Sequence, residues 1–263
     1  MFDLLVGERS RGHDTICLPA RWRRPPIRCS VHRGRPTAAE RELLVTTKVG
    51  VARTGPDGEW RLDGRPAVLR DQVEQALRRL RVERIELLRL HRIDPETPLA
   101  DQLGTLRELR DEGKVGRIGL SEVTGDELDR ARRIVDVASV QNRYNLLDRE
   151  HEPVPAACEA AGIAFLPSRP VAWGEPGQRS EVAAVAAEAG ATPSRIALAW
   201  LLGHSPVVLP IPGTARIAHL EENLAAEGVE LSPAQRELAR RPLREPGRRN
   251  GAVAPRRGSG RHG

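Results

Sequence analysis

The sequence of 263 residues has few aromatic side chains, few cysteines and no long apolar run. Aromatic residues make up 3% of it, and Tyr144 is the single tyrosine. The three cysteines, Cys17, Cys29 and Cys158, form no CxxC pair. We therefore expect no disulfide framework and no metal site, which is typical of a reducing cytoplasm. The absence of an apolar stretch of about 18 residues excludes a helical membrane span, and the N-terminus lacks the pattern of a signal peptide.

The net charge of +6 is concentrated at the two ends of the chain. Residues 1–45 and 236–263 together carry 18 arginines against seven acidic residues, whereas the segment between them is slightly acidic. A basic tail can bind nucleic acid through phosphate contacts. Neither end has the interleaved aromatic residues or the recognisable module of a nucleic-acid reader. We therefore favour an unstructured arginine-rich end and expect no nucleic-acid partner.

Strand and helix patterns alternate regularly from about residue 43. Near-continuous apolar strands that alternate with helices are typical of a parallel sheet covered by helices, either doubly wound or closed into a barrel. A doubly wound dinucleotide-binding sheet normally carries GxGxxG after an early strand, and no such motif follows these strands. We therefore predict an α/β fold, a (β/α)8 barrel of the TIM type. The predicted strands are 43–49, 85–91, 116–121, 138–144, 163–167 and 207–211, and the predicted helices are 66–80, 98–112, 125–135, 154–161, 180–189, 194–203 and 219–226.

The two ends depart from this pattern, which divides the chain into three parts. We assign residues 1–42 to a degenerate N-terminal segment, 43–235 to the barrel domain and 236–263 to a basic disordered tail. A long polar loop at 52–65 follows the first strand of the barrel domain. This loop is either a plain surface excursion or a lid or substrate wall, and the two interpretations have equal support.

Lys48 and His91 each stand at the C-terminal end of an apolar run, in TTKVG and LLRLHRID respectively. Taken singly, Lys48 is a strand-end lysine that reaches solvent, and His91 is a histidine of the core. A barrel of parallel strands keeps its chemistry at the C-terminal ends of its strands. The two residues together therefore indicate a proton-transfer site.

From about residue 44 to 231 the chain resembles the aldo-keto reductases, in particular the bacterial branch that carries an LHRID segment. The resemblance implies an eight-stranded barrel that uses NADPH without a Rossmann motif and acts on small carbonyl compounds. It rests on six segments in order, TTKVG at 46–50, LHRID at 90–94, KVGRIGLSEVT at 114–124, SVQNRYN at 139–145, GIAFLP at 162–167 and PIPGTARIAHLEEN at 210–223.

The resemblance assigns catalytic roles. In the family, a tyrosine gives a proton to the carbonyl oxygen while NADPH gives hydride to the carbon. A lysine paired with an aspartate lowers the tyrosine pKa, and a histidine hydrogen-bonds the carbonyl oxygen. Lys48, His91 and Asp14 match the lysine, histidine and aspartate. Pro19 stands where the tyrosine is expected, and Tyr144 falls at a different position that is usually structural.

The N-terminal segment is short for this family. Only 13 residues precede Asp14, where the family has its first strand and a helix. We therefore predict a barrel that is incomplete at its N-terminal first unit, from a truncated or frame-shifted start. Sequencing the upstream DNA tests this idea, since an in-frame transcript that begins at Met1 with no family-like reading frame upstream would contradict it.

The resemblance also implies a nicotinamide site. Ser121 and Gln141 match the residues that hold the nicotinamide carboxamide. Glu122 replaces the usual asparagine beside Ser121, and Ser168 replaces the aromatic residue that stacks on the ring.

The remaining cofactor residues lie in the segment PGTARIAHLEEN. Gly213, Thr214 and Arg216 match the phosphate loop before a helix start, and Arg216 is expected to pair with the adenosine 2′-phosphate. Glu222 and Asn223 match the pair that reads the adenine amino group. An ordinary helix N-terminus followed by a solvated turn is the alternative.

The sequence thus predicts a cytoplasmic, NADP-dependent oxidoreductase that reduces aldehydes or ketones to alcohols. A catalytically impaired remnant that binds only the nucleotide is the alternative. A basic-tailed nucleic-acid-associated protein is a third hypothesis.

Overall fold

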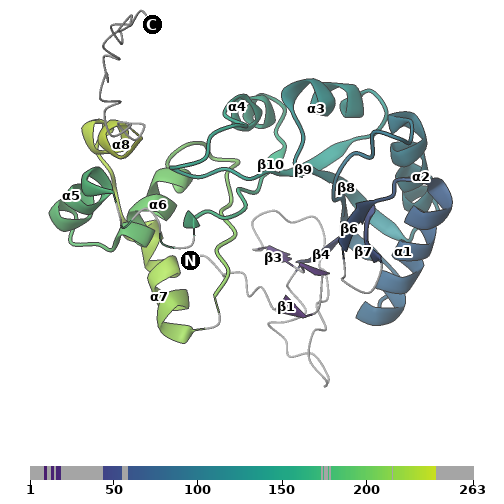
Figure 1. Cartoon of the computed structure of the whole chain (residues 1–263), viewed down its shortest axis with the longest axis horizontal. Helices are drawn as coiled ribbons and strands as arrows, with labels where there is room; N and C mark the ends of the chain where they lie inside the picture. The colour runs from purple at the N-terminus through teal and green to yellow at the C-terminus, as the bar shows by residue number, and fades with distance from the viewer. Residues whose placement is uncertain are drawn as a thin grey trace, which may run out of the picture.

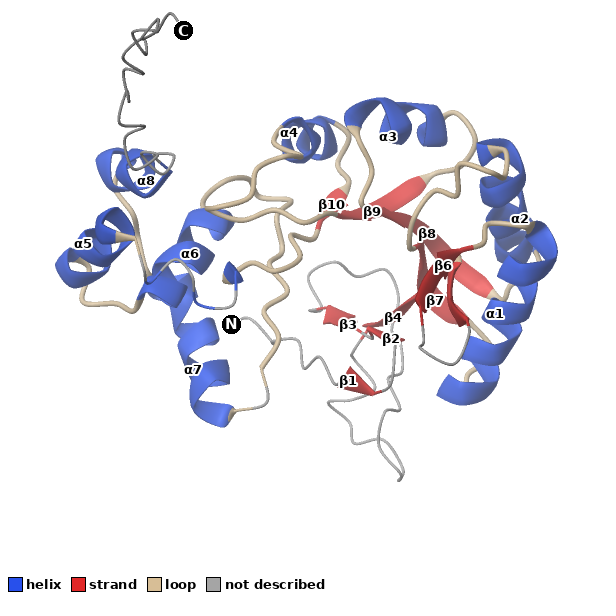
Figure 2. Ribbon diagram, in the orientation of Figure 1, coloured by secondary structure: helices blue, strands red, loops and turns tan. Residues whose placement is uncertain are grey.

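The computed structural model describes residues 44–54, 59–172, 174, 177, 179–214 and 216–240, together with the short strands β1 (Arg9–Ser10), β2 (His13–Asp14) and β3 (Ile16–Leu18). A curved sheet forms its centre, and helices α1 to α4 lie along the outer side of that sheet (Figure 1). Helices α5 to α8 gather beyond the β10 edge, as the blue ribbons show (Figure 2).

Five parallel strands make up the body of the sheet, in the spatial order β10, β9, β8, β7 and β4. Sequence neighbours are also spatial neighbours, as expected for successive β–α units of a barrel. β3 runs antiparallel beside β4, so within the described residues no parallel strand continues the sheet on that side. The bounds are β4 Leu44–Val49, β7 Ile85–Leu90, β8 Val115–Ser121, β9 Val137–Gln141 and β10 Ala164–Phe165.

The helices begin where local sequence signals place them. Pro66 and Pro193 occupy the first turns of α1 and α6, where the missing N–H costs nothing. Thr124 and Glu127 form a reciprocal capping box at the start of α3. The bounds are α1 Pro66–Leu80, α2 Leu99–Asp111, α3 Gly125–Arg132, α4 Pro153–Ala160, α5 Ser180–Glu188, α6 Pro193–Leu202, α7 Ile217–Ala225 and α8 Pro233–Arg240, with a 3-10 turn, η4, at Ala226–Gly228.

The two faces of the sheet differ in chemistry because side chains alternate along each strand. On the outer face, apolar residues such as Leu88, Leu120 and Val140 are buried against the helices. On the inner face, Arg89 and Ser139 are buried as well, although both are polar. A buried polar face opposite an apolar one indicates that the inner face holds the functional groups.

The strand predicted at 207–211 is not a strand in the structure, which is a correction. Val208 forms an isolated parallel bridge with Phe165. The Phe165 N–H donates to the Val207 carbonyl (2.9 Å), and the Leu209 N–H donates to the Phe165 carbonyl (2.8 Å). Pro206 and Pro210 bracket this stretch and supply no N–H, so pairing cannot extend in either direction. The segment still takes the next parallel position beside β10.

The loop predicted at 52–65 is also corrected, because half of its residues belong to an antiparallel hairpin of β5 (Val51–Thr54) and β6 (Glu59–Leu62). The connection at 55–58 reads GPDG, which is a turn sequence. The Asp63 N–H donates to the Gly50 carbonyl (3.1 Å), which ties the hairpin to the end of β4.

Residues 236–240, which we assigned to the tail, belong to α8. Arg236 donates to the carbonyls of Gly203 (2.5 Å) and Leu231 (3.0 Å), and the buried Arg179 donates to the Ala239 carbonyl (3.4 Å). The contacts to Gly203 and from Arg179 dock α8 on the end of α6 and on the residue that precedes α5. Residues 241–263 and most of the predicted N-terminal segment lie outside the described residues. None of the described helices has the length and apolar character needed to cross a membrane.

Candidate functional site

Lys48 and His91 come from neighbouring parallel strands. Lys48 pairs in register with Arg89, and the His91 N–H continues the ladder by donating to the Val49 carbonyl (2.8 Å). Residues 48, 89 and 91 therefore share the inner face, with His91 one step nearer the C-terminal edge. Both Lys48 and His91 are half-buried. The structure thus brings the two predicted residues to one edge of the sheet.

Arg89 is a site residue that the sequence reasoning missed. It is fully buried and pairs in register with Gly119 of β8, which pairs with Ser139 of β9. A Cβ at Gly119 would lie 2.7 Å from Arg89 Cγ and would also collide with Ser139 Oγ. The absence of a side chain at Gly119 therefore leaves room for the Arg89 side chain over β8 on the inner face. An arginine in an apolar run followed by a strand glycine was the signal available in the sequence.

Asp94 fixes the loop that follows His91. Its carboxylate accepts hydrogen bonds from the N–H groups of Gly64 (2.8 Å) and Glu96 (2.9 Å) and from the Thr97 hydroxyl (2.9 Å). The Gly64 N–H is the largest cause that holds the pKa of Asp94 below its ordinary value. Gln102 closes the same loop by accepting from the Asp94 N–H (3.0 Å) and donating to its carbonyl (2.9 Å). The hairpin end and the histidine loop are thus held as one unit.

Ser121 and Gln141 lie directly opposite each other at the ends of β8 and β9. Both are buried. In the part of the chain that the structure describes, Gln141 Oε1 and Ser139 Oγ are buried without a hydrogen-bond partner. Buried acceptors without a donor are costly in a finished core, so they fit a surface that receives a ligand amide.

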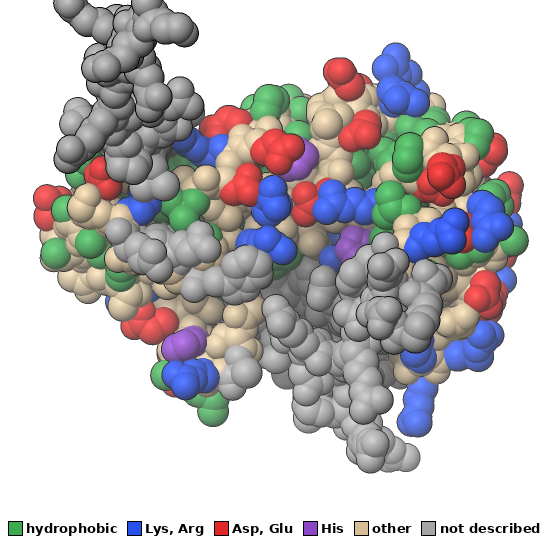
Figure 3. Space-filling view, in the orientation of Figure 1, with side chains coloured by type: hydrophobic (Ala, Val, Ile, Leu, Met, Phe, Trp, Pro, Cys, Tyr) green, Lys and Arg blue, Asp and Glu red, His purple; other side chains and the backbone are tan. Residues whose placement is uncertain are grey.

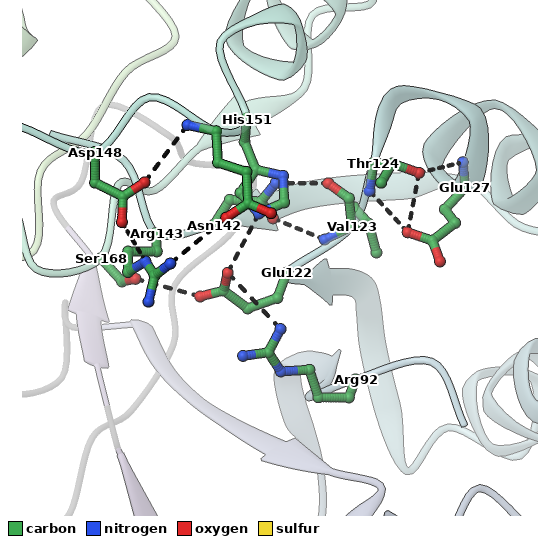
Figure 4. A network of polar contacts seen from close by, with 11 residues as sticks. Arg92, Glu122, Val123, Thr124, Glu127, Asn142, Arg143, Asp148, His151 and Ser168 are labelled. Atoms are coloured by element: carbon green, nitrogen blue, oxygen red, sulfur yellow. Dashed lines mark hydrogen bonds and ion pairs between the residues drawn. The ribbon is translucent and has the colours of Figure 1, made fainter. Parts of the chain in front are cut away.

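Glu122 carries negative charge at the same edge and joins three strand ends (Figure 4). Its Oε2 lies 3.9 Å from Arg92 Nη1 and 3.6 Å from His151 Nε2, and Ser168 Oγ donates to its Oε1 (3.5 Å). The side chain is 14% exposed. The face of the molecule viewed in Figure 3 carries acidic, basic and histidine side chains close together near its middle. Of these contacts, sequence reasoning noted only that Glu122 and Ser168 replace other residue types.

Asn142 secures the peptide that follows Glu122. It is fully buried, its Oδ1 accepts from the Val123 N–H (3.0 Å), and its Nδ2 donates to the Val123 carbonyl (2.6 Å). The next residue, Arg143, pairs with Asp148 (2.5 Å) and Glu150 (3.5 Å) on the following loop. The β8 and β9 ends are therefore rigidly joined.

The segment with Gly213, Thr214 and Arg216 follows the chain stretch that lies beside β10 and leads into α7. Thr214 Oγ1 accepts from the Arg216 N–H (3.1 Å), and the Arg216 side chain is exposed. Glu222 accepts from the Thr192 hydroxyl (2.8 Å) at the cap of α6, and Asn223 is half-buried. Gly213, Thr214 and Arg216 thus lie just before the first turn of α7, where N–H groups favour anions, whereas Glu222 and Asn223 lie in the second half of that helix.

The structure describes less of the two positions where the family has its catalytic aspartate and tyrosine. The backbone of Asp14 lies in β2, but its side chain and Pro19 fall outside the described residues. Tyr144 is fully buried and packs edge-on against Phe165 (5.8 Å) and stacked on Trp200 (5.9 Å). Phe165 belongs to the apolar cluster under the helices. Tyr144 is therefore a core residue on the side of the sheet opposite Lys48.

This arrangement has counterparts in known proteins. Residues 33–175 and 178–240 match the model of the aldo/keto reductase family. The chain belongs to that family. An oxidoreductase of Schizosaccharomyces pombe is 45% identical over 193 residues, 72% of this chain and 62% of that protein. The matched part of this aldo/keto reductase therefore spans less than two thirds of that relative.

Two further similar proteins support the same family membership. Pyridoxine 4-dehydrogenase of Escherichia coli is 39% identical over 197 residues, 73% of this chain and 68% of that protein. An aldo/keto reductase from Klebsiella pneumoniae, in complex with NADP and acetate, has a TM-score of 0.61 at 27% identity and covers 69% of this chain and 68% of that one. The predicted family and the predicted α/β barrel class are thereby confirmed for this aldo/keto reductase.

Proposed function

We propose that this aldo/keto reductase is an NADP-dependent oxidoreductase that reduces an aldehyde or ketone of small size to the alcohol. One observation carries the proposal. The opposed pair Ser121 and Gln141 lies on the same sheet face and edge as Lys48 and His91, and among the described residues the buried Gln141 Oε1 has no hydrogen-bond partner. The Klebsiella relative in complex with NADP supports the cofactor, and the relative called pyridoxine 4-dehydrogenase supports the reaction class.

Each residue of the nicotinamide side then has a defined task. Bound NADPH supplies the hydride. Gln141 Oε1 accepts a hydrogen bond from the carboxamide N–H2, which satisfies the buried oxygen. Ser121 places its hydroxyl beside the same carboxamide. Lys48, with Asp14 as its acidic partner, provides positive charge, and His91 hydrogen-bonds the carbonyl oxygen as negative charge develops there. The alkoxide that forms takes its proton from solvent.

At the other end of the cofactor, the start of α7 holds the phosphates. The free N–H groups of the first turn of α7 would favour an anion there. Arg216, which is exposed, pairs with the 2′-phosphate and so selects NADP over NAD. Glu222 and Asn223 contact the adenine, and the hydrogen bond that Glu222 accepts from Thr192 joins α7 to the cap of α6.

Binding of the nucleotide without turnover is a second candidate, favoured by a specific observation. Pro19 offers no hydroxyl, and the single tyrosine, Tyr144, is buried in the apolar core on the opposite side of the sheet. In this second case the protein keeps the cofactor site but lacks the tyrosine that donates the proton in the family. A cytoplasmic location stays a prediction under either candidate.

One assay separates the two candidates. The full chain is mixed with NADPH and 4-nitrobenzaldehyde, and absorbance at 340 nm is followed. We expect turnover that Lys48→Met abolishes. Lys114→Met is the matched control, because Lys114 forms surface ion pairs with Glu74 (2.7 Å) and Glu112 (3.0 Å) away from the site. NADPH fluorescence that changes without turnover supports the binding-only candidate, and no change at all contradicts both.

A further inference from the structure

Glu122 occupies a backbone conformation that its residue type rarely adopts. Its φ is +55°, in the left-handed region that favours glycine or asparagine. It directly follows the buried Ser121, and its N–H donates to the Gln141 carbonyl (2.8 Å). The chain thus turns sharply at the point where we place the nicotinamide, and the turn sets the Glu122 carboxylate beside that position.

The carboxylate is only partly neutralised by its neighbours. Arg92 lies 3.9 Å away with a side chain that is 50% exposed, so water screens this pair. His151 lies 3.6 Å away and contributes a positive charge only when it is protonated. Ser168 is neutral and offers a hydroxyl at 3.5 Å. The side chain of Glu122 is itself mostly buried, so its residual negative charge acts in a medium of reduced dielectric constant.

We propose that Glu122 makes the nicotinamide site bind the oxidised cofactor more tightly than the reduced one. The proposal rests on the proposed function. The oxidised nicotinamide ring carries a positive charge, and the reduced ring is neutral. Glu122 accepts a hydrogen bond from Ser168 and directly follows Ser121, and these are two positions that the family resemblance places at the nicotinamide. A carboxylate in that place attracts only the oxidised form.

Such a preference changes which direction of the reaction the protein favours. A ligand that binds one form of a redox pair more tightly shifts the equilibrium toward that form. In the favoured direction, the carbonyl carbon receives the hydride from the cofactor, and the alkoxide oxygen takes a proton from solvent as the alcohol forms. The substrate class that this site favours is then the carbonyl compound that is reduced, rather than the alcohol.

A substitution of the nearby Arg92 should change the preference for the oxidised cofactor in the direction opposite to a substitution of Glu122. Its positive charge opposes the effect of Glu122 on the ring. Glu122→Gln keeps the shape and removes the negative charge, so the preference for the oxidised cofactor should fall. Arg92→Gln removes the opposing charge, so the preference should rise. A loss of structure at the strand ends would weaken both cofactor forms alike, and it would not give opposite changes in the two variants.

The experiment measures two dissociation constants for the full chain and both variants. NADPH is titrated by its fluorescence, and NADP+ is titrated by displacement of NADPH. We expect Glu122→Gln to lower the ratio of the NADPH constant to the NADP+ constant by about tenfold, and Arg92→Gln to raise it several-fold. A tenfold change in this ratio is about 30 mV for a two-electron couple. Adenosine 2′,5′-bisphosphate, which lacks the ring, is the control ligand and should bind all three proteins equally.

The outcomes are distinct. Ratios that move in opposite directions, with equal binding of the bisphosphate, support the proposal. Ratios that stay equal in all three proteins overturn this inference and leave the proposed function standing. Failure of the unsubstituted chain to bind either cofactor form overturns the proposed function and this inference together.

Discussion

Lys48 of β4 and Arg89 of β7 lie opposite each other in register on neighbouring parallel strands, and the Arg89 side chain is fully buried. Two basic residues therefore share the inner face with Ser121 and Gln141. A face of this kind favours an anionic ligand, or a reaction in which negative charge develops on an oxygen. Reduction of a carbonyl compound is such a reaction.

Gly119→Ala tests how tightly Arg89, Gly119 and Ser139 pack together on the inner face of the sheet. The new Cβ would lie 2.7 Å from Arg89 Cγ and would also meet Ser139 Oγ and the Ser139 carbonyl. We expect a loss of about 1–3 kcal/mol in the free energy of unfolding, measured with urea. Gly104→Ala in α2 is the control, because nothing lies within 4 Å of its added Cβ. It should stabilise the protein by roughly 0.5–1 kcal/mol. A fall in stability confined to Gly104→Ala would contradict the packing described.

Asp94→Asn tests the loop that carries His91. Hydrogen bonds led by the Gly64 N–H hold the pKa of Asp94 below its ordinary value of 3.8. A folded-state pKa below the unfolded one means that this contribution is present above about pH 4 and is lost as pH falls through the folded value. We expect a cost of about 1–3 kcal/mol at pH 7 from the weakened bonds. The difference between the two proteins should shrink at acid pH, and a constant difference from pH 7 to 3 would contradict the account.

Cys158 should be unreactive in the folded protein. Burial raises its pKa to about 12, so the thiol stays protonated at pH 8, and the side chain is fully buried in α4. With Cys17 and Cys29 replaced by serine, mass spectrometry should show little alkylation by iodoacetamide at pH 8. Complete alkylation should follow in urea. Rapid alkylation without urea would show that α4 is not packed as described.

Arg236→Ala tests whether α8 belongs to the fold. Arg236 donates to the carbonyls of Gly203 (2.5 Å) and Leu231 (3.0 Å), so its loss should cost about 1–2 kcal/mol by urea denaturation. Arg132→Ala is the matched control, since Arg132 is exposed and its contact to Asp129 is 3.7 Å. Equal stability of the two variants would return residues 236–240 to the tail.

The periodic elements could be predicted from sequence because local signals determine them. The predicted helix at 66–80 coincides with α1, whose residues Leu69, Val73 and Leu77 form one buried face. The strands that deliver Lys48 and His91 were placed to within one residue, because apolar runs between polar turns have few other solutions.

The remainder depends on contacts between distant residues. The 207–211 run is apolar enough for a strand, but two prolines limit its pairing to a single bridge. The docking of Arg236 on Gly203 spans 33 residues and leaves no periodic signal. Likewise, the ion pairs of Glu122 with Arg92 and His151 and its hydrogen bond from Ser168 join residues far apart in the sequence, so the sequence showed only an unusual substitution at that position. The roles of Asp14 and Pro19 stay predictions.

Titration of the full chain with NADPH, followed by fluorescence, tests the central claim most directly when it is repeated with Gln141→Leu. The claim is that the cofactor carboxamide satisfies the buried Gln141 Oε1. We predict saturable binding by the unsubstituted chain and a dissociation constant about tenfold higher in the variant, from the loss of roughly one buried hydrogen bond. Gln75→Leu, on the exposed surface of α1, should bind as the unsubstituted chain does. No binding by the unsubstituted chain, or equal binding by Gln141→Leu, would contradict the account.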